Sequence, residues 1–164
     1  MVTSTPVIDE RLENWLHAHA IPFEVHPHPL TFTALATARA EGIEPRTFAK
    51  VVGVRTDAGR VALIVVDAVD ALDLGKVRHL IGEPVRLLSE LELTAACPEW
   101  EVGTVPPVPT LAGVQVFADE GVRSDPQISF NAGSHRVAVR VDRAGWEEAA
   151  EIAYGDLVRR RTDR

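Results

Sequence analysis

Lysine is nearly missing from this chain of 164 residues, because only Lys50 and Lys76 among its 17 basic residues are lysines. The rest are arginines, and the two side chains are not interchangeable: lysine offers a compact point charge with three rotatable donors. Lys50 also interrupts residues 48–54, an otherwise apolar run that predicts a buried strand. Burying an unpaired ammonium group is costly, so it must reach solvent or face a polar cavity. We therefore expect Lys50 to meet an oxygen-rich ligand, with a solvated strand-edge lysine as the structural alternative.

Other absences narrow the class of protein. The single cysteine, Cys97, rules out an internal disulfide and suits a reducing compartment. Residues 1–10 lack the basic and apolar segments of a signal peptide. The longest apolar run, residues 61–66, is too short to span a bilayer. These features predict a cytoplasmic protein with no membrane partner.

Acidic residues outnumber basic residues in this chain, 24 to 17. The formal net charge is −7 and the pI is about 5.3, which argues against a broad nucleic-acid-binding face, because such a face must neutralise many phosphates. We therefore expect no DNA partner. A pocket that takes only the end of a nucleic acid is compatible with this charge.

The residues that are present predict one domain over residues 1–164, with 46% hydrophobic residues to form its core. Helix starts are predicted from cap residues and hydrophobic periodicity at Thr5-Pro6, Thr33, Asp73, Ser89 and Asp142. The last of these helices is expected to carry Ile152 and Ala153. A hairpin is predicted over residues 48–66, and shorter strands over 23–28, 85–88, 113–118, 127–131 and 135–141. Interleaved helices and hairpins predict an α+β (mixed α/β) fold with a largely antiparallel or mixed sheet.

Familiar nucleophile arrangements are absent from the sequence. There is no G-x-S-x-G elbow. Ser134 and His135 are adjacent, and adjacent strand residues point to opposite faces, so they form a poor dyad. Cys97 has no basic neighbour in the sequence and is expected to serve packing.

Metal-ligand spacing is equally sparse. His17 and His19 stand two apart on a predicted helix and do not share a face. His26 and His28 could share a face of an extended segment, but no third ligand follows at diagnostic spacing. We expect no metal site and no cofactor.

Two loops carry residue types suited to binding. In residues 101–107, Gly103 allows close backbone approach, and the prolines that follow fix the rest of the loop rigidly. In residues 128–135, Gly133 is expected to break the chain between two strands and to expose backbone N–H groups to an oxyanion or a carboxylate. A plain crossover and a plain turn are the structural alternatives for these two segments.

Four blocks taken in order resemble the YbaK family of aminoacyl-tRNA editing domains, which includes the editing domain associated with prolyl-tRNA synthetase. The blocks are residues 48–52, 101–107, 116–119 and 128–135. The resemblance extends from about residue 23 to residue 150. One difference is that Val108-Pro109 stands where similar proteins usually have Phe-Gly after Pro-Pro, which changes one pocket wall.

The resemblance implies a mixed, partly barrel-like β core surrounded by helices, and an activity that hydrolyses the ester of a mischarged tRNA. It implies small amino acids on tRNA-Pro or a related tRNA, water attack assisted by the substrate's own ribose hydroxyl, and possible association with a synthetase. It places catalytic roles on Lys50, Gly133 and Asp119. The substrate-binding residues expected beside them are Gly103, Val105, Pro106, Ser129, Asn131, Ala132 and His135.

Two other functions stay open at the level of sequence. A non-catalytic module of the same fold could bind tRNA or a synthetase, and the Val108-Pro109 change is the feature that favours it. A metal-dependent hydrolase would have to use His26 and His28. An assay of mischarged tRNA hydrolysis distinguishes the binding module from the deacylase. Metal analysis of the purified protein tests for the metal-dependent hydrolase.

Overall fold

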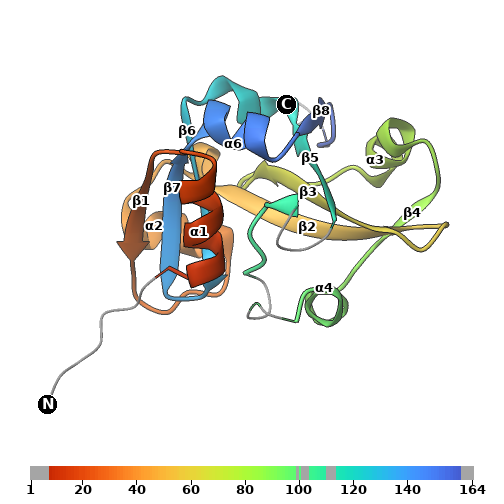
Figure 1. Cartoon of the computed structure of the whole chain (residues 1–164). Helices are drawn as coiled ribbons and strands as arrows, with labels where there is room; N and C mark the ends of the chain where they lie inside the picture. Colours follow the sequence, from red (N-terminus) through yellow and green to blue (C-terminus); the bar gives the residue numbers. More distant parts are fainter. Residues whose placement is uncertain (1–7, 99, 101–103, 110–113, 160–164) are drawn as a thin grey trace, which may run out of the picture.

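A computed structural model describes residues 8–98, 100, 104–109 and 114–159 of the chain (Figure 1). Its helices are α1 (Glu10–Ala18), α2 (Ala34–Glu41), α3 (Leu74–Ile81), α4 (Glu90–Ala96) and α6 (Arg143–Ala149), with 3-10 turns η1 (Pro45–Thr47) and η2 (Glu120–Ser124). Its strands are β1 (Phe23–Pro27), β2 (Ala49–Thr56), β3 (Val61–Asp67), β4 (Val85–Leu87), β5 (Gln115–Asp119), β6 (Gln127–Ser134), β7 (Val137–Asp142) and β8 (Ala153–Gly155).

Within the described ranges the strands form two sheets. The first has three strands in the order β1-β7-β6, all antiparallel. The second has five strands in the order β4-β2-β3-β5-β8, in which β5 runs parallel to both β3 and β8. The sheets meet where Phe48, just before β2, forms a parallel bridge with Ser129 of β6.

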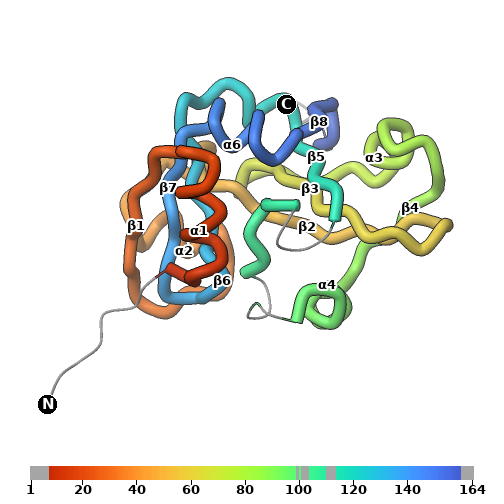
Figure 2. Tube along the Cα trace, viewed as in Figure 1, coloured from red at the N-terminus to blue at the C-terminus, as the bar shows by residue number. Residues whose placement is uncertain are grey.

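Helices cover both sheets. In Figure 1, α1 lies in front of the first sheet, and Leu12, Trp15 and Leu16 of α1 are buried. The tube in Figure 2 shows α3 and α4 on opposite sides of the β2–β3 hairpin, joined through β4. The largest cluster of buried apolar residues includes Leu63 and Val65 of the second sheet together with Phe130 and Val139 of the first. One core therefore joins the two sheets.

Local sequence signals explain most helix boundaries. The side chains of Thr33, Asp73, Ser89 and Asp142 each accept a hydrogen bond from a backbone N–H in the first turn of the helix that follows. The predicted start at Thr5-Pro6 lies outside the described residues, and α1 begins instead after Asp9, whose carboxylate accepts from the Arg11 N–H. The caps confirm the four helix starts, and the helices together with the two sheets confirm the predicted α+β class. The described sheets are open and do not close into a barrel.

Two predicted boundaries were wrong. Strand β6 does not stop before Gly133 but continues to Ser134 through a bulge between Asn131 and Ser134. The last helix does not reach Ala153, because α6 ends at Ala149 and Glu151 has a φ of +53°. Ala153 instead begins β8, a short strand whose pairing partner β5 is distant in sequence.

Among the described residues, no helix combines the length and the apolar composition needed to cross a membrane.

Candidate functional site

A pocket of about 150 Å³ lies where β2 leaves the neighbourhood of β6. Its lining residues are Phe32, Thr33, Ala34, Ala49, Lys50, Val51, Glu90, Val105 and Asn131. Strand β2 pairs with β4 from Val54 to Thr56, and just before β2 begins Phe48 forms the bridge to Ser129 of β6. The stretch of β2 between these contacts therefore borders the pocket, with the starts of α2 and α4 around it.

Lys50 lines this pocket and is partly buried. Its Nζ donates a hydrogen bond to the backbone carbonyl of Asp70 at 2.7 Å. Because side chains alternate along a strand, Lys50 leaves β2 on the face opposite to Ala49 and Val51, toward Asp70. An ammonium has three donors, so two of them have no acceptor among the described residues. Burial lowers the pKa of Lys50, and the negative charge of Asp70 partly offsets this effect.

Asn131 brings a second polar group to the pocket. Its Oδ1 atom is buried and has no hydrogen-bond partner among the described residues. An unsatisfied buried acceptor is costly and calls for an explanation, and a ligand donor is one such explanation. Val105 is 4% exposed and supplies an apolar wall. Of the predicted site residues, the structure therefore brings Lys50, Val105 and Asn131 together.

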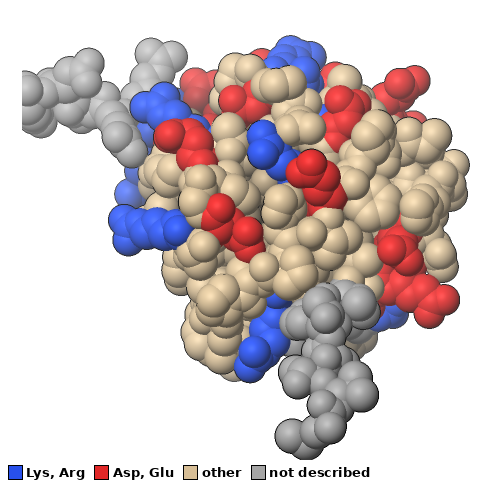
Figure 3. Space-filling view, turned by 90° about the vertical axis from the view of Figure 1, so that its left-hand side faces the viewer, with Lys and Arg blue, Asp and Glu red and all other residues tan. Residues whose placement is uncertain are grey.

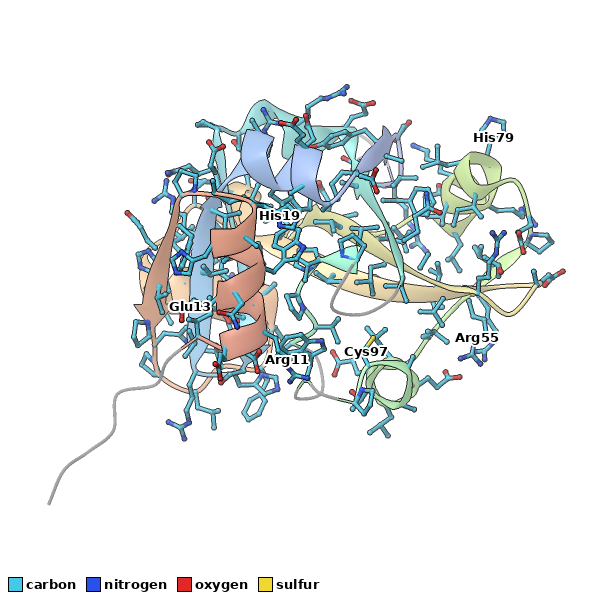
Figure 4. The ribbon with its side chains drawn as sticks, in the orientation of Figure 1. Arg11, Glu13, His19, Arg55, His79 and Cys97 are labelled. Carbon is cyan, nitrogen blue, oxygen red and sulfur yellow. The ribbon has the colours of Figure 1, made fainter. Side chains whose placement is uncertain are left out.

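Gly133 differs from its expected role. It has a φ of +83°, but its N–H donates to the Thr104 carbonyl at 3.1 Å, so this donor is not exposed to a ligand as predicted. A Cβ added here would clash with Cε3 of the Trp100 ring. The Arg11 guanidinium of α1 lies 5.0 Å from the centre of the Trp100 ring (Figure 4). Gly133 thus holds the bulge of β6 against Trp100 and Thr104.

Asp119 lies outside the lining of the pocket and is 5% exposed. Its Oδ1 accepts from the Leu157 N–H at 2.8 Å, and its Oδ2 accepts from the Gly121 N–H at 2.9 Å. Both oxygens therefore hold backbone in place at the end of β5. The catalytic role implied for Asp119 by resemblance has no support in these contacts.

His135 lies behind the pocket wall. Its Nδ1 donates to the Thr31 carbonyl at 2.9 Å, and its ring packs 4.9 Å from the ring of Phe32. Ser129, Ala132 and Pro106 are buried outside the pocket lining. Gly103 lies outside the described residues.

Several lining residues were missed by sequence reasoning. Phe32 is 65% exposed, and an aromatic side chain within a proline-rich polar loop was the available signal. Thr33 and Glu90 had been interpreted only as parts of helix starts. Nothing local distinguishes a helix start that borders a pocket from one that borders solvent, because this depends on how distant elements pack.

An acidic group stands beside the Lys50 acceptor. Asp67 has its pKa raised from 3.8 to about 7, chiefly by burial and then by the negative charges of Asp70, Asp125 and Asp119, while Arg46 opposes the shift. These carboxylates do not form a metal centre. Among the described residues, no group of three or more histidine, cysteine or acidic side chains is arranged to hold a metal ion.

The histidine pair of the alternative hydrolase is engaged elsewhere. His26 Nε2 lies 3.3 Å from Glu24, and its Nδ1 lies 3.8 Å from Glu41. His28 Nδ1 donates to the Pro29 carbonyl at 2.7 Å. Cys97, the residue that follows α4, is fully buried on the side of that helix facing the sheet (Figure 4), in agreement with a packing role.

Comparisons with known proteins find a matching family model and similar solved structures. The chain matches the family model of the aminoacyl-tRNA editing domain over residues 28–149. A crystal structure of a hypothetical protein is 23% identical, with a TM-score of 0.83 over 92% of this chain and 100% of that one. A "putative trans-editing enzyme for prolyl tRNA synthetase" is 25% identical, with a TM-score of 0.77 over 92% of this chain and 96% of that one. No curated protein matches the sequence.

Proposed function

The chain belongs to the family of aminoacyl-tRNA editing domains, and from this premise we propose that it is a deacylase that hydrolyses the ester of a mischarged tRNA. The observation that carries the proposal is the pocket itself. Its lining includes Lys50, whose ammonium has two donors without an acceptor among the described residues, together with Asn131 and an apolar wall.

Hydrolysis of an aminoacyl ester requires the protein mainly to position the reacting groups. An aminoacyl ester is already activated, so holding it and a water in reactive geometry, with a donor for the developing oxyanion, lowers the barrier. Lys50 is suited to donate to an ester or phosphate oxygen. Asn131 Oδ1 is suited to accept from the substrate ammonium or from a ribose hydroxyl. The substrate's own 2′-hydroxyl then assists the attacking water.

The size of the pocket favours a small substrate. A volume of about 150 Å³ accommodates a small aminoacyl group and leaves the nucleoside at the rim. Ala49, Val51 and Val105 give that volume apolar walls. We propose small amino acids as the substrates, and tRNA-Pro or a related tRNA as the carrier. The likeness to a protein described as acting in trans for prolyl tRNA synthetase supports this choice.

The test is a panel of mischarged tRNAs incubated with the purified protein, with the released amino acid measured over time. We expect release from tRNAs that carry small amino acids and little release from those that carry bulky ones. If the protein releases amino acid from every tRNA of the panel no faster than spontaneous hydrolysis does, the proposal is rejected.

A non-catalytic module of the same fold is the second candidate. The observation that favours it is the Gly133 N–H, which is consumed by Thr104 and cannot serve as an oxyanion donor in this structure. Such a module would bind aminoacyl-tRNA without accelerating its hydrolysis. A binding assay run beside the same panel separates the two functions, and contact with a synthetase would be tested in the same way.

A further inference from the structure

Two arginines face each other across β2 and β4. Arg55 and Arg86 are direct partners in the antiparallel register, so their side chains lie on the same face of the sheet. Side chains at such positions are about 5 Å apart at Cβ, and like charges placed directly opposite destabilise a sheet. The pair needs an explanation for this reason.

The two arginines of this pair do not each have a carboxylate partner. Arg86 donates to Glu92 of α4 at 3.0 Å. The Arg55 side chain makes no hydrogen bond or ion pair within the described residues, and its Nε is buried. By contrast, Arg60 on the same hairpin has its own acid, Glu83, at 2.6 Å. One carboxylate therefore stands against two guanidinium groups, and a desolvated donor is left over.

The pair lies on the sheet face that carries two residues of the pocket lining, opposite to the face of Lys50. Because side chains alternate along a strand, Arg55 shares a face with Val51 and Ala49, which line the pocket. Val51 and Arg55 are about 13 Å apart along β2, at the rise of an extended strand. Helix α4 borders both places, since its Glu90 lines the pocket and its Glu92 holds Arg86. Figure 4 labels Arg55 toward the hairpin end of β2.

We propose that Arg55 and Arg86 form a phosphate subsite for the single-stranded acceptor end of tRNA; the proposal rests on the function proposed above. If the terminal aminoacyl group occupies the pocket, the nucleotides that precede it must run over the adjoining surface. Guanidinium forks match phosphate oxygens and form charge-assisted hydrogen bonds with them. A phosphate between the two arginines supplies the acceptor that Arg55 lacks and relieves the like-charge repulsion.

A local subsite also suits the charge of the molecule. The net charge is −7, and Figure 3 shows acidic and basic side chains interspersed over one face. An acidic protein of this kind needs a localised contact to hold a nucleic acid end. Two arginines beside the pocket provide one without a broad basic surface.

The experiment compares two substrates of the same protein. One is aminoacyl-tRNA, and the other is an aminoacyl-adenosine ester with the same amino acid and no upstream phosphates. We expect Arg55→Gln and Arg86→Gln each to lower kcat/KM for the tRNA about tenfold and to leave the adenosine ester unchanged. The slope of log kcat/KM against log salt should become shallower by about 0.7 for each phosphate that the variant no longer binds. Arg123→Gln, which removes an exposed arginine paired with Glu120, is the control.

Thermal unfolding separates a ligand role from a structural one. Removing one of two facing like charges should leave the Tm of Arg55→Gln unchanged or raise it, whereas a structural arginine would lower it. Equal losses on both substrates, or no loss on the tRNA, would overturn the subsite. If the wild type hydrolyses neither substrate, the proposed function fails, and the subsite is then judged by binding of an uncharged acceptor-stem minihelix. Unchanged affinity in both variants would overturn it there as well.

Discussion

Lys50 and Asn131 are the two residues of the pocket lining to which we assign polar contacts with the proposed ester substrate. Their chemistry explains why such residue types interrupt strands that are otherwise apolar. The lysine was recognisable in the sequence because a charge among strand residues is unusual. Asn131 was recognisable only through the family resemblance, because a lone asparagine near a glycine equally predicts a turn. The buried state of its Oδ1 depends on how β6 packs, which no local pattern contains.

Asn131→Ala separates ligand binding from stability. In the free protein the Oδ1 acceptor is buried without a partner, so its removal should leave the free energy of unfolding unchanged or slightly higher. If that oxygen accepts from the substrate, kcat/KM should fall about tenfold, the equivalent of about 1.4 kcal/mol. Denaturant unfolding and deacylation measured on the same preparation check this prediction. A variant that is destabilised and fully active would show that the amide serves the fold.

Gly133 and Gly59 form a matched pair of glycines with positive φ. A Cβ at Gly133 would meet the buried Trp100 ring, whereas a Cβ at Gly59 would meet nothing within 4 Å. Gly59→Ala should therefore cost about 1 kcal/mol of backbone strain and retain its activity per folded molecule. Gly133→Ala should cost clearly more and also reduce activity, because Trp100 must shift beside the segment that leads to Val105. Melting curves and turnover that change equally in the two variants would contradict this account.

Asp67 predicts the pH dependence of stability. Its folded pKa of about 7 lies above the ordinary 3.8, so between these values the folded protein keeps a proton that the unfolded chain has released. The contribution of Asp67 to the free energy of unfolding therefore falls as pH rises from about 4 through about 7. Asp67→Asn should flatten that fall and raise stability at pH 8 by of order 1 kcal/mol. Parallel stability curves for variant and wild type between pH 5 and 8 would contradict the assigned shift.

At the scale of elements, the sequence predicted what local chemistry determines. The caps at Thr33, Asp73, Ser89 and Asp142 were placed correctly, because each side chain satisfies a backbone donor within its own helix. Strand β8 was missed because three residues carry no periodic signal, and only pairing with β5 makes them a strand. The continuation of β6 through Gly133 was missed for a related reason, since a glycine predicts a turn and a bulge equally well.

The capping interaction at the start of helix α4 is expected to support both stability and activity. Its Ser89 side chain accepts from the Glu92 N–H, and the Glu92 side chain accepts in return from the Ser89 N–H. Ser89→Ala should lower the free energy of unfolding by about 1 kcal/mol. Activity on aminoacyl-tRNA should fall as well, because α4 carries Glu90 at the pocket and Glu92 beside Arg86.

The control for this prediction is a cap of the same kind far from the pocket. Asp142 accepts from the Gly145 N–H at the start of α6, and Asp142→Ala should cost a similar amount of stability. Its activity per folded molecule should stay at the level of the wild type. Equal losses of activity in the two cap variants would mean that α4 has no particular connection to the site.

At the scale of the whole molecule, two open sheets share one core, and the pocket lies near the place where they meet. The sequence predicted the class of fold, while the family resemblance predicted the region of the site. Neither predicted the walls contributed by Phe32, Thr33 and Glu90, because these residues reach the pocket through packing of α2 and α4 against distant strands. The shared core also predicts that the domain expected over residues 1–164 unfolds in one cooperative transition.

The most direct test of the central claim is deacylation of the best mischarged tRNA by the wild type, Lys50→Ala and Lys76→Ala. Lys76 is the only other lysine, and it pairs with Asp156 away from the pocket, so its variant controls for loss of a positive charge. Loss of the Lys50 donors should raise the barrier by about 2–4 kcal/mol, a fall of roughly 30- to 1000-fold in kcat/KM. Lys50→Arg should not restore the rate, because a planar fork does not replace a point charge. The account predicts a folded, inactive Lys50→Ala beside an active Lys76→Ala, and a folded Lys50→Ala that deacylates as fast as the wild type would contradict it.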